Sequence, residues 1–312
     1  MQAVSARQLQ RKFGPYTAVD DLTFDVEEGE VFGLLGPNGA GKTTTIRLLS
    51  CLIYRTAGSA AVCGFEITEE PCKIREMVGV QTENPCLYER LTTFENLDFF
   101  AQAFGISNLE DKRQRIRELL EFFNLWDDRD KKVDHLSKGM KQKLALARAL
   151  VHKPKLLLLD EPTANLDPES AAEVRTMISQ LSEREGRTVL LSTHHLEDAE
   201  KLCDRVMIVN RGVRVTEGTP QELLESVGDP VVEVTLRNRS TMIANSLRGN
   251  AGVKAVALAD HQKLVITLDN PDSTTPDLVA AIVRDGGEIL SVKPLTPSLE
   301  DAYLQLLGRN PV

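Results

Sequence analysis

Short, uninterrupted runs of apolar residues recur through the first two thirds of the chain. The clearest are Val31–Leu35, Leu156–Leu159, Val189–Leu191 and Val206–Val209. Strands that are buried on both faces show such runs, whereas strands with one solvated face alternate. Segments with helical periodicity separate the runs, so we expect an α/β core whose sheet is largely parallel.

Two regions beside this core follow other patterns. Up to about residue 29, apolar and polar positions alternate around Ala18-Val19 and Leu22–Phe24, which predicts an antiparallel β subdomain. Between residues 84 and 150 the sequence contains no strand-like run. Charged stretches such as Glu110–Phe123 predict a helical insertion beside the sheet there.

The C-terminal part has a third pattern. After a turn at Arg211-Gly212, the segment Thr219–Glu222 predicts a capped helix, and the character of the sequence changes at Val227–Pro230. We therefore predict a domain boundary at this change, with one domain over residues 1–227 and an accessory domain over residues 228–312. The second domain is predicted to contain, in order, a strand at 231–236, a helix near 241–247, strands near 253–258 and 264–268, a helix near 277–285, a strand at 288–292 and a helix from Ser298. This order indicates a small α+β domain of the ferredoxin-like type.

Composition and charge narrow the class of protein. The chain has 312 residues and a formal net charge of −9. Nucleic-acid binding needs a basic surface, so we expect no nucleic-acid partner. Any site for an anion must instead concentrate positive charge locally.

The cysteines and the apolar segments indicate where the protein works. The five cysteines are odd in number and form no C-x-x-C pair, which indicates reduced thiols rather than a disulfide or zinc framework. The N-terminus lacks the apolar segment of a secretory signal, and no apolar run approaches the roughly 18 residues of a membrane-spanning helix. We expect a cytoplasmic protein that lies at the inner face of the cell membrane only as a peripheral partner.

A glycine-rich segment follows the first apolar run and fits the pattern G-x-x-x-x-G-K-[ST]. In such a loop the backbone N–H groups turn inward around phosphate oxygens, which leaves no room for side chains. A helix predicted over Thr44–Ile53 adds partial positive charge at its N-terminus. Lys42 is expected to reach the β- and γ-phosphates, and the Thr43 hydroxyl to coordinate Mg²⁺. The residues predicted to bind nucleotide here are Gly36, Asn38, Gly39, Ala40, Gly41, Lys42, Thr43 and Thr44.

Two adjacent carboxylates, Asp160 and Glu161, end the apolar run Leu156–Leu159. Burying such a pair is costly unless a ligand uses it. Beside a phosphate loop, Asp160 is expected to hold Mg²⁺ and Glu161 to point to where a water attacks the γ-phosphate. His194 follows another apolar run and could orient that water, although a histidine at such a place, taken alone, is more often an ordinary loop residue.

Taken in order, these motifs resemble the ATP-binding cassette family over about residues 3–220. The glycine-rich loop is similar to its Walker A motif, and Leu156–Glu161 to its Walker B strand. By this resemblance, the remaining motifs are Gln81 as the Q-loop glutamine, Leu136–Gln142 as the signature segment, Ala164–Asp167 as the D-loop and His194 as the switch histidine.

The resemblance implies an ATPase with a P-loop NTPase core and with ATP and Mg²⁺ as cofactors. It implies catalytic roles for Glu161, His194 and Lys42, metal contacts for Thr43, Gln81 and Asp160, and nucleotide contacts for Gln81 and Asp167. Phe13 lies where the family often places an aromatic that stacks on adenine. Tyr16 is its competitor, and either could be an ordinary core aromatic; we prefer Phe13, because its distance before Lys42 suits the family better.

The signature segment departs from the commonest form, LSGGQ. Lys138 replaces a glycine and Met140 replaces the glutamine. The resulting LSKGM segment resembles the signature segments of drug- and sodium-exporter subunits. Ser137 still supplies a hydroxyl at a predicted helix N-terminus, and Gly139 leaves the backbone open to phosphate. An N-capped basic helix is the simpler interpretation of the same residues, and the two are compatible.

The resemblance also implies partners. In this family Ser137 and Gly139 contact the γ-phosphate held by the other copy's Walker A loop, so a complete site needs two chains. The second chain would be a copy of the first or a paralogous ATPase subunit. ATP would close a head-to-tail dimer and hydrolysis would open it, which would drive export through separate membrane permease subunits. Residues from Glu83 to about Phe104 would form the groove for a permease helix, although we expect most of the apolar residues among Phe94, Leu97, Phe99 and Phe100 to be helical core.

Other functions remain open to weigh. The C-terminal domain resembles the accessory domain of exporter-type cassettes, and Pro297–Tyr303 resembles their P-S-L-E-D-x-F ending, which indicates dimer support or regulation. A translation or DNA-repair ATPase usually has a second cassette or long coiled coils, which this sequence lacks. A regulatory module with an inactive site would have lost some of the catalytic residues named above. The transported substrate is not encoded in this subunit.

Overall fold

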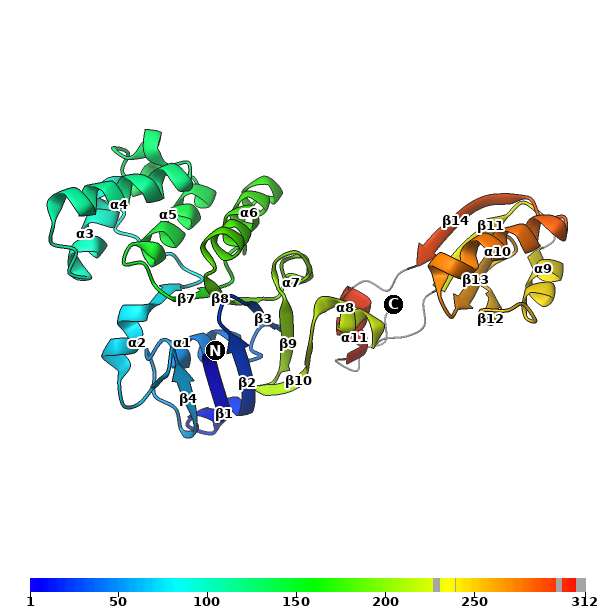
Figure 1. Cartoon of the computed structure of the whole chain (residues 1–312), viewed down its shortest axis with the longest axis horizontal. Helices are drawn as coiled ribbons and strands as arrows, with labels where there is room; N and C mark the ends of the chain where they lie inside the picture. The colour runs from blue at the N-terminus through cyan, green and yellow to red at the C-terminus, as the bar shows by residue number, and fades with distance from the viewer. Residues whose placement is uncertain (227–230, 239, 296–298, 307–312) are drawn as a thin grey trace. The chain divides into compact units, whose positions relative to one another are not determined.

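Figure 1 shows the computed structural model of the chain, which describes residues 1–226, 231–238, 240–295 and 299–306. The chain divides into two compact units, Met1–Pro220 and Gln221–Val312. The predicted domain boundary after residue 227 falls outside the described residues and stays a prediction.

A six-stranded sheet forms the centre of the first unit, in the order β10-β9-β3-β8-β7-β6. Its strands are β3 (Val31–Leu35), β6 (Val78–Gln81), β7 (Leu156–Asp160), β8 (Thr188–Thr193), β9 (Arg205–Asn210) and β10 (Val213–Gly218). All neighbouring strands are parallel except β9 and β10. Every residue of β3, β7 and β8 is buried, so the prediction of a largely parallel sheet covered on both faces is confirmed.

A second, antiparallel sheet has the order β2-β1-β4-β5. Its strands are β1 (Gln2–Phe13), β2 (Tyr16–Glu27), β4 (Ala57–Val62) and β5 (Phe65–Glu66). The two sheets share one apolar core, in which Phe24 of β2 stacks on Phe32 of β3 with ring centroids 5.7 Å apart. The predicted antiparallel β subdomain is therefore confirmed.

The helix after the glycine-rich loop, α1 (Lys42–Leu49), ends earlier than predicted. Cys51 adopts a left-handed conformation with φ 56. The amides of Leu52 and Ile53 then both bond back to Arg47 O, at 2.9 and 3.3 Å. A left-handed residue of this kind closes a helix, so the segment up to Ile53 is a turn rather than a last helical turn.

The helical insertion contains α3 (Thr93–Ala103), α4 (Leu109–Phe122) and α5 (Lys138–Leu150). Every residue from 84 to 150 is described and none belongs to a named strand, as predicted. Thr92 and Glu95 form a capping box at the start of α3, and Asn108 caps α4. The first unit also contains α2 (Pro71–Met77), α6 (Pro168–Glu185) and α7 (Leu196–Leu202).

Helix α8 (Pro220–Glu225) begins at the last residue of the first unit and continues into the second. The second unit contains a four-stranded antiparallel sheet of order β12-β13-β11-β14. Its elements are β11 (Val231–Leu236), α9 (Ser240–Leu247), β12 (Val253–Leu258), β13 (Lys263–Leu268), α10 (Pro271–Arg284), β14 (Ile289–Leu295) and α11 (Leu299–Leu306). The βαββαβ order from β11 to β14, with β11 and β13 in the middle of the sheet, is the predicted ferredoxin-like arrangement. Within the described residues, no helix of either unit has the length and apolar character to cross a membrane.

Candidate active site

A pocket of about 340 Å³ lies beside the glycine-rich loop. Its lining residues are Phe13, Tyr16, Ala18, Asn38, Gly39, Ala40, Gly41, Lys42, Thr43, Thr44, Glu83, Glu161, Ala164, Asn165 and His194. The loop follows β3, Glu161 follows β7 and His194 follows β8, so the pocket lies at the carboxyl edge of three adjacent parallel strands. Open α/β sheets bind ligands at this edge.

Two glycines of the loop are required by the backbone around them. A Cβ at Gly36 would lie 2.2 Å from Val209 O, and a Cβ at Gly41 would lie 2.4 Å from Ala18 O. Gly41 also has φ 104, a conformation that side chains disfavour. The loop therefore lies directly against β2 and β9 and leads into the N-terminus of α1, whose first N–H groups have no partner within the helix.

Lys42, the first residue of α1, is buried. Its Nζ donates hydrogen bonds to Gly36 O at 2.6 Å and Pro37 O at 3.3 Å. It also forms an ion pair with Glu161 Oε1 at 3.2 Å. A buried ammonium group beside the loop amides supplies the local positive charge that an anion site in an acidic protein needs.

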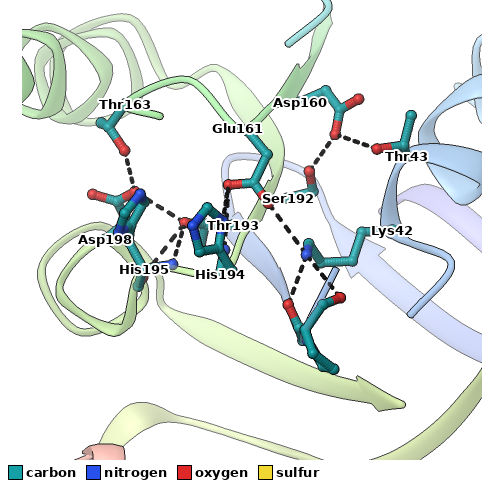
Figure 2. A network of polar contacts seen from close by, with 12 residues as sticks. Lys42, Thr43, Asp160, Glu161, Thr163, Ser192, Thr193, His194, His195 and Asp198 are labelled. Carbon is teal, nitrogen blue, oxygen red and sulfur yellow. Dashed lines mark hydrogen bonds and ion pairs between the residues drawn. The ribbon is translucent and has the colours of Figure 1, made fainter. Parts of the chain in front are cut away.

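Asp160 ends β7 and is 2% exposed. Its Oδ1 accepts hydrogen bonds from Ser192 Oγ at 2.5 Å and Thr43 Oγ1 at 3.0 Å (Figure 2). Burial raises the pKa of this carboxyl group above its usual value, the two hydroxyl donors oppose that rise, and the nearby Glu161 and Glu83 carboxylates add to it. A cation placed here would reverse this balance by favouring the ionised form.

Glu161 lies between two groups that bind its two oxygens (Figure 2). Oε1 pairs with Lys42, and Oε2 lies 2.8 Å from His194 Nδ1. The backbone N–H of His194 also donates to Oε2, at 3.3 Å. Glu161 has φ 52, an unusual value for a residue other than glycine, and such conformations concentrate at functional sites.

Gln81 has the features expected of a metal-contacting amide. It ends β6 opposite Leu159 of β7, next to the strand end that carries Asp160. It is fully buried, its Nε2 donates to Thr82 O at 2.6 Å, and its Oε1 has no hydrogen-bond partner. Buried carbonyl oxygens are normally satisfied, so this orphaned oxygen fits a role as a cation ligand.

The set of Thr43, Gln81 and Asp160 suits Mg²⁺ better than a metal whose ligands all come from the protein. Among the described residues, no group of three or more histidine, cysteine or acidic side chains could hold a metal. Mg²⁺ commonly takes one or two carboxylates and completes its shell with waters and substrate phosphates. One carboxylate, one hydroxyl and one unpartnered amide oxygen fit that requirement.

The signature segment (Leu136–Gln142) lies outside the pocket. Ser137 caps α5 by accepting a hydrogen bond from Met140 N at 3.2 Å, as the N-cap interpretation predicts. Gly139 is buried, and a Cβ there would lie 2.5 Å from Ser170 Oγ. Glycine is therefore needed at this position for the contact with α6, and the predicted contact of Gly139 with phosphate stays a prediction. Neither Ser137 nor Gly139 lines the pocket of its own chain.

The D-loop (Ala164–Asp167) connects the pocket to α6. Ala164 and Asn165 line the pocket, whereas Asp167 caps α6 by accepting a hydrogen bond from Ser170 N at 3.0 Å. That bond holds the pKa of Asp167 below its usual value. In the described chain Asp167 thus acts as a helix cap, and its predicted contact with nucleotide stays a prediction.

Phe13 and Tyr16 both line the pocket and both are exposed, by 44% and 56%. The Arg11 guanidinium lies 4.3 Å from the Phe13 ring centroid, and the Tyr16 hydroxyl donates to Gly39 O at 3.3 Å. Either ring is accessible to a purine base. The preference for Phe13 over Tyr16 stays a prediction.

Most of the predicted site residues meet in one place, and the structure adds some that sequence patterns did not reveal. Glu83 lines the pocket, Asn165 of the predicted D-loop lines it without an assigned role, and Ser192 donates to Asp160 from the second-last position of β8. Ser192 could have been found from its place, since it ends an apolar run that neighbours the Asp160 strand. Glu83 lies two residues after Gln81, but nothing in its local sequence indicates a pocket.

Comparisons with known proteins agree with this geometry. The sequence matches the family described as ABC transporter over residues 19–164 and the family described as ATP-binding protein DrrA1-3-like, C-terminal domain, over residues 218–307. It is 33% identical over 308 residues to the linearmycin resistance ATP-binding protein LnrL of Bacillus subtilis, covering 98% of each chain. The chain belongs to the ABC transporter family of ATP-binding proteins. It is also 41% identical over 313 residues to the Nod factor export ATP-binding protein I of Burkholderia lata, covering 98% of this chain and 97% of that one.

Solved structures resemble this ABC ATP-binding protein over its first unit. An ATP-binding subunit of an ABC transporter matches with a TM-score of 0.65 and 32% identity, covering 72% of this chain and 92% of that chain. A dimeric, post-hydrolysis structure of the cassette MJ0796 bound to ADP and Pi matches with a TM-score of 0.64 and 27% identity, covering 69% and 98%. The predicted family, its fold and its class as an ATPase that serves transport are confirmed.

Proposed function

We propose that this ABC ATP-binding protein is the ATP-hydrolysing subunit of an exporter and that its catalytic centre is the cluster of Lys42, Glu161 and His194. The observation that supports this most strongly is the position of Glu161. Its carboxylate lies in the pocket beside the phosphate loop, with one oxygen on Lys42 and the other on His194. A carboxylate in this place can accept a proton from a water that attacks the γ-phosphate.

The loop residues would hold the phosphates of ATP. The N–H groups of the loop and of the first turn of α1 would donate to phosphate oxygens, and Thr43, Gln81 and Asp160 would be the protein ligands of Mg²⁺. When bound, Mg²⁺ neutralises phosphate charge and keeps the γ-phosphate in line with the water. Phe13 would stack on the adenine.

Lys42 changes partners when nucleotide binds. In the described chain its Nζ is shared among Gly36 O, Pro37 O and Glu161 Oε1. A γ-phosphate carries more charge than any of these acceptors, so it draws Nζ away from the carboxylate. Glu161 Oε1 then becomes free to accept a hydrogen bond from water, while His194 keeps the other oxygen fixed.

The second half of the site would come from another chain. ABC cassettes dimerise and work with membrane permeases, and neither Ser137 nor Gly139 reaches the pocket of its own chain. We propose a head-to-tail dimer in which these residues and Asp167 face the nucleotide of the other subunit. Two copies of this chain, or this chain with a paralogous subunit, would form it.

Export is the direction that the relatives support. One is named for resistance to linearmycin and the other for Nod factor export, and both match this chain along almost its whole length. We propose that the dimer lies at the inner face of the cell membrane beneath separate permease subunits. Residues from Glu83 to about Phe104 would receive a permease helix.

The test is Glu161→Gln in the purified full chain. Glutamine keeps the shape of the side chain but cannot take the proton, so the variant is expected to bind Mg·ATP, to hydrolyse it at least about 100-fold more slowly and to accumulate as a dimer. Glu118→Gln, on the exposed face of α4, is the matched control and is expected to behave like the parent protein. Normal hydrolysis by Glu161→Gln would disprove the assignment of the base. A monomer with ATP bound would disprove the shared site.

A further inference from the structure

A buried carboxylate, that of Asp198, lies close to Thr163 and Thr193, near the ends of β7 and β8 (Figure 2). Asp198, in the first turn of α7, has no solvent exposure. Its Oδ2 accepts hydrogen bonds from Thr163 Oγ1 and, at 3.0 Å, from Thr193 Oγ1. Its Oδ1 lies 3.1 Å from Arg175 Nη1. Asp198 does not line the pocket, so contact with nucleotide does not explain its burial.

The three partners of Asp198 come from three different parts of the site. Thr163 immediately precedes the D-loop, whose residues Ala164 and Asn165 line the pocket. Thr193 ends β8 and immediately precedes His194. Arg175 lies on α6, the helix that follows the D-loop. One carboxylate therefore joins the segments that follow β7 and β8 to the helix behind them.

The contacts of Thr193 connect Asp198 to His194 and Glu161. Its Oγ1 accepts a hydrogen bond from His195 N at 2.9 Å, and its own proton goes to Asp198. The backbone is thereby fixed on both sides of His194, whose N–H and Nδ1 both bind Glu161 Oε2. A shift of Thr193 would move His194 relative to Glu161, and catalytic geometry is sensitive to displacements of this size.

A purely structural role would not require these partners. Buried ion pairs contribute little to stability compared with well-packed apolar residues, because desolvation offsets their attraction. Arg175 also pairs with Glu197 at 3.3 Å, so it does not depend on Asp198 alone. The two threonine hydroxyls, in contrast, join Asp198 to segments that lead directly into the pocket.

We propose that Asp198 is a positioning residue for ATP hydrolysis: through Thr163 and Thr193 it holds the D-loop and His194 in the arrangement that turnover needs. This inference rests on the proposed function, since it assigns a role relative to the same site. Asp198 also links the D-loop to the segment that carries His194. We therefore expect its carboxylate to transmit a displacement of the D-loop to His194.

The experiment replaces each threonine with valine, which keeps the shape and removes the hydroxyl, and with serine, which keeps the hydroxyl. Thr163→Val and Thr193→Val are expected to lower kcat about 10- to 100-fold with little change in the KM for Mg·ATP. Thr163→Ser and Thr193→Ser should retain kcat to within about twofold. Thr176→Val is the matched control, because Thr176 is exposed on α6 and its hydroxyl donates to Ala172 O of the same helix.

Melting temperature and ATP affinity separate this role from a loss of folding. Valine variants that melt and bind ATP like the parent protein but turn over slowly would support the proposal, and so would a parallel loss of kcat in Asp198→Asn. Undiminished kcat in both valine variants would overturn it, as would serine variants as slow as the valine ones. If Lys42→Ala is inactive in the same assay, such a result removes only the role of Asp198 and leaves the proposed function intact.

Discussion

The two units of this ABC ATP-binding protein pack apolar side chains against a sheet in similar ways, but they bury very different polar groups. The first unit buries many polar residues, and a group of them lies at the carboxyl edge of the sheet, including Lys42, Gln81, Asp160, Glu161 and Asp198. In the described part of 231–295, only Ser240 is both polar and buried. Because a buried charge is costly, its presence marks the unit that does chemistry. The described part of the ferredoxin-like domain, residues 231–295, buries no charged side chain.

Removing the buried cation should have the largest effect. Lys42→Ala deletes the group that draws the γ-phosphate into place and leaves Glu161 without its ion-pair partner. We expect ATP turnover to fall by about 100-fold or more. A steady-state ATPase assay measures this, with Lys73→Ala, an exposed lysine that pairs with Glu70, as the control. If Lys42→Ala and Lys73→Ala lost ATP turnover equally, Lys42 would have no specific role in hydrolysis.

Asp160→Asn should separate catalysis from stability. Turnover is expected to fall by about 100-fold, since asparagine brings no charge to Mg²⁺. Burial raises the pKa of Asp160, so between its unfolded and folded pKa values the folded chain without nucleotide binds more protons than the unfolded chain. Stability from this group is present below the unfolded pKa and is lost as the pH rises through the folded pKa.

Asparagine cannot ionise, so the Asp160→Asn variant does not lose stability in this way as the pH rises. In the absence of Mg²⁺ and nucleotide, the melting temperature of Asp160→Asn should therefore rise relative to the parent protein as the pH increases through this window. Thermal melts at a series of pH values measure the difference. A difference in melting temperature that is the same at every pH would contradict a raised pKa of Asp160 in the folded chain.

A substitution in the second unit should give the smallest effect on turnover. Ile266→Ala removes a fully buried side chain from the ferredoxin-like core and should destabilise that unit by about 2–5 kcal/mol. ATP turnover should stay within about twofold, because every residue that lines the pocket belongs to the first unit. Val265→Ala, at a half-buried position next to it, is the control. A large loss of turnover in Ile266→Ala would show that the accessory domain acts on catalysis.

The sequence predicted those parts of the fold whose pattern is local. Buried parallel strands appear as apolar runs, and the glycine-rich loop is marked by its own residues. Strand β10 was missed because it lies at the sheet edge, where Val213 and Val215 are exposed and polar residues alternate with them. The end of α1 was placed too late because the left-handed turn at Cys51 has no glycine to mark it.

The candidate site was predictable as far as its motifs are contiguous. Lys42, Asp160, Glu161 and His194 each follow a recognisable strand, and parallel strands bring their carboxyl ends together. Asp198, Thr163 and Arg175 meet only because α6 and α7 pack behind those strands, and no spacing along the chain reveals that. The contacts that we propose for Ser137 and Gly139 with a second chain likewise cannot be derived from the structure of one chain.

The N-cap at Ser137 has a consequence for how mutations there should be interpreted. Accepting a hydrogen bond from Met140 N uses a lone pair of the serine oxygen and leaves the hydroxyl hydrogen available. One atom can thus secure the helix start and still offer a proton to an incoming anion. Alanine would abolish both abilities at once, whereas asparagine or aspartate would preserve the first and alter the second, so the choice of replacement determines which of the two a measurement detects.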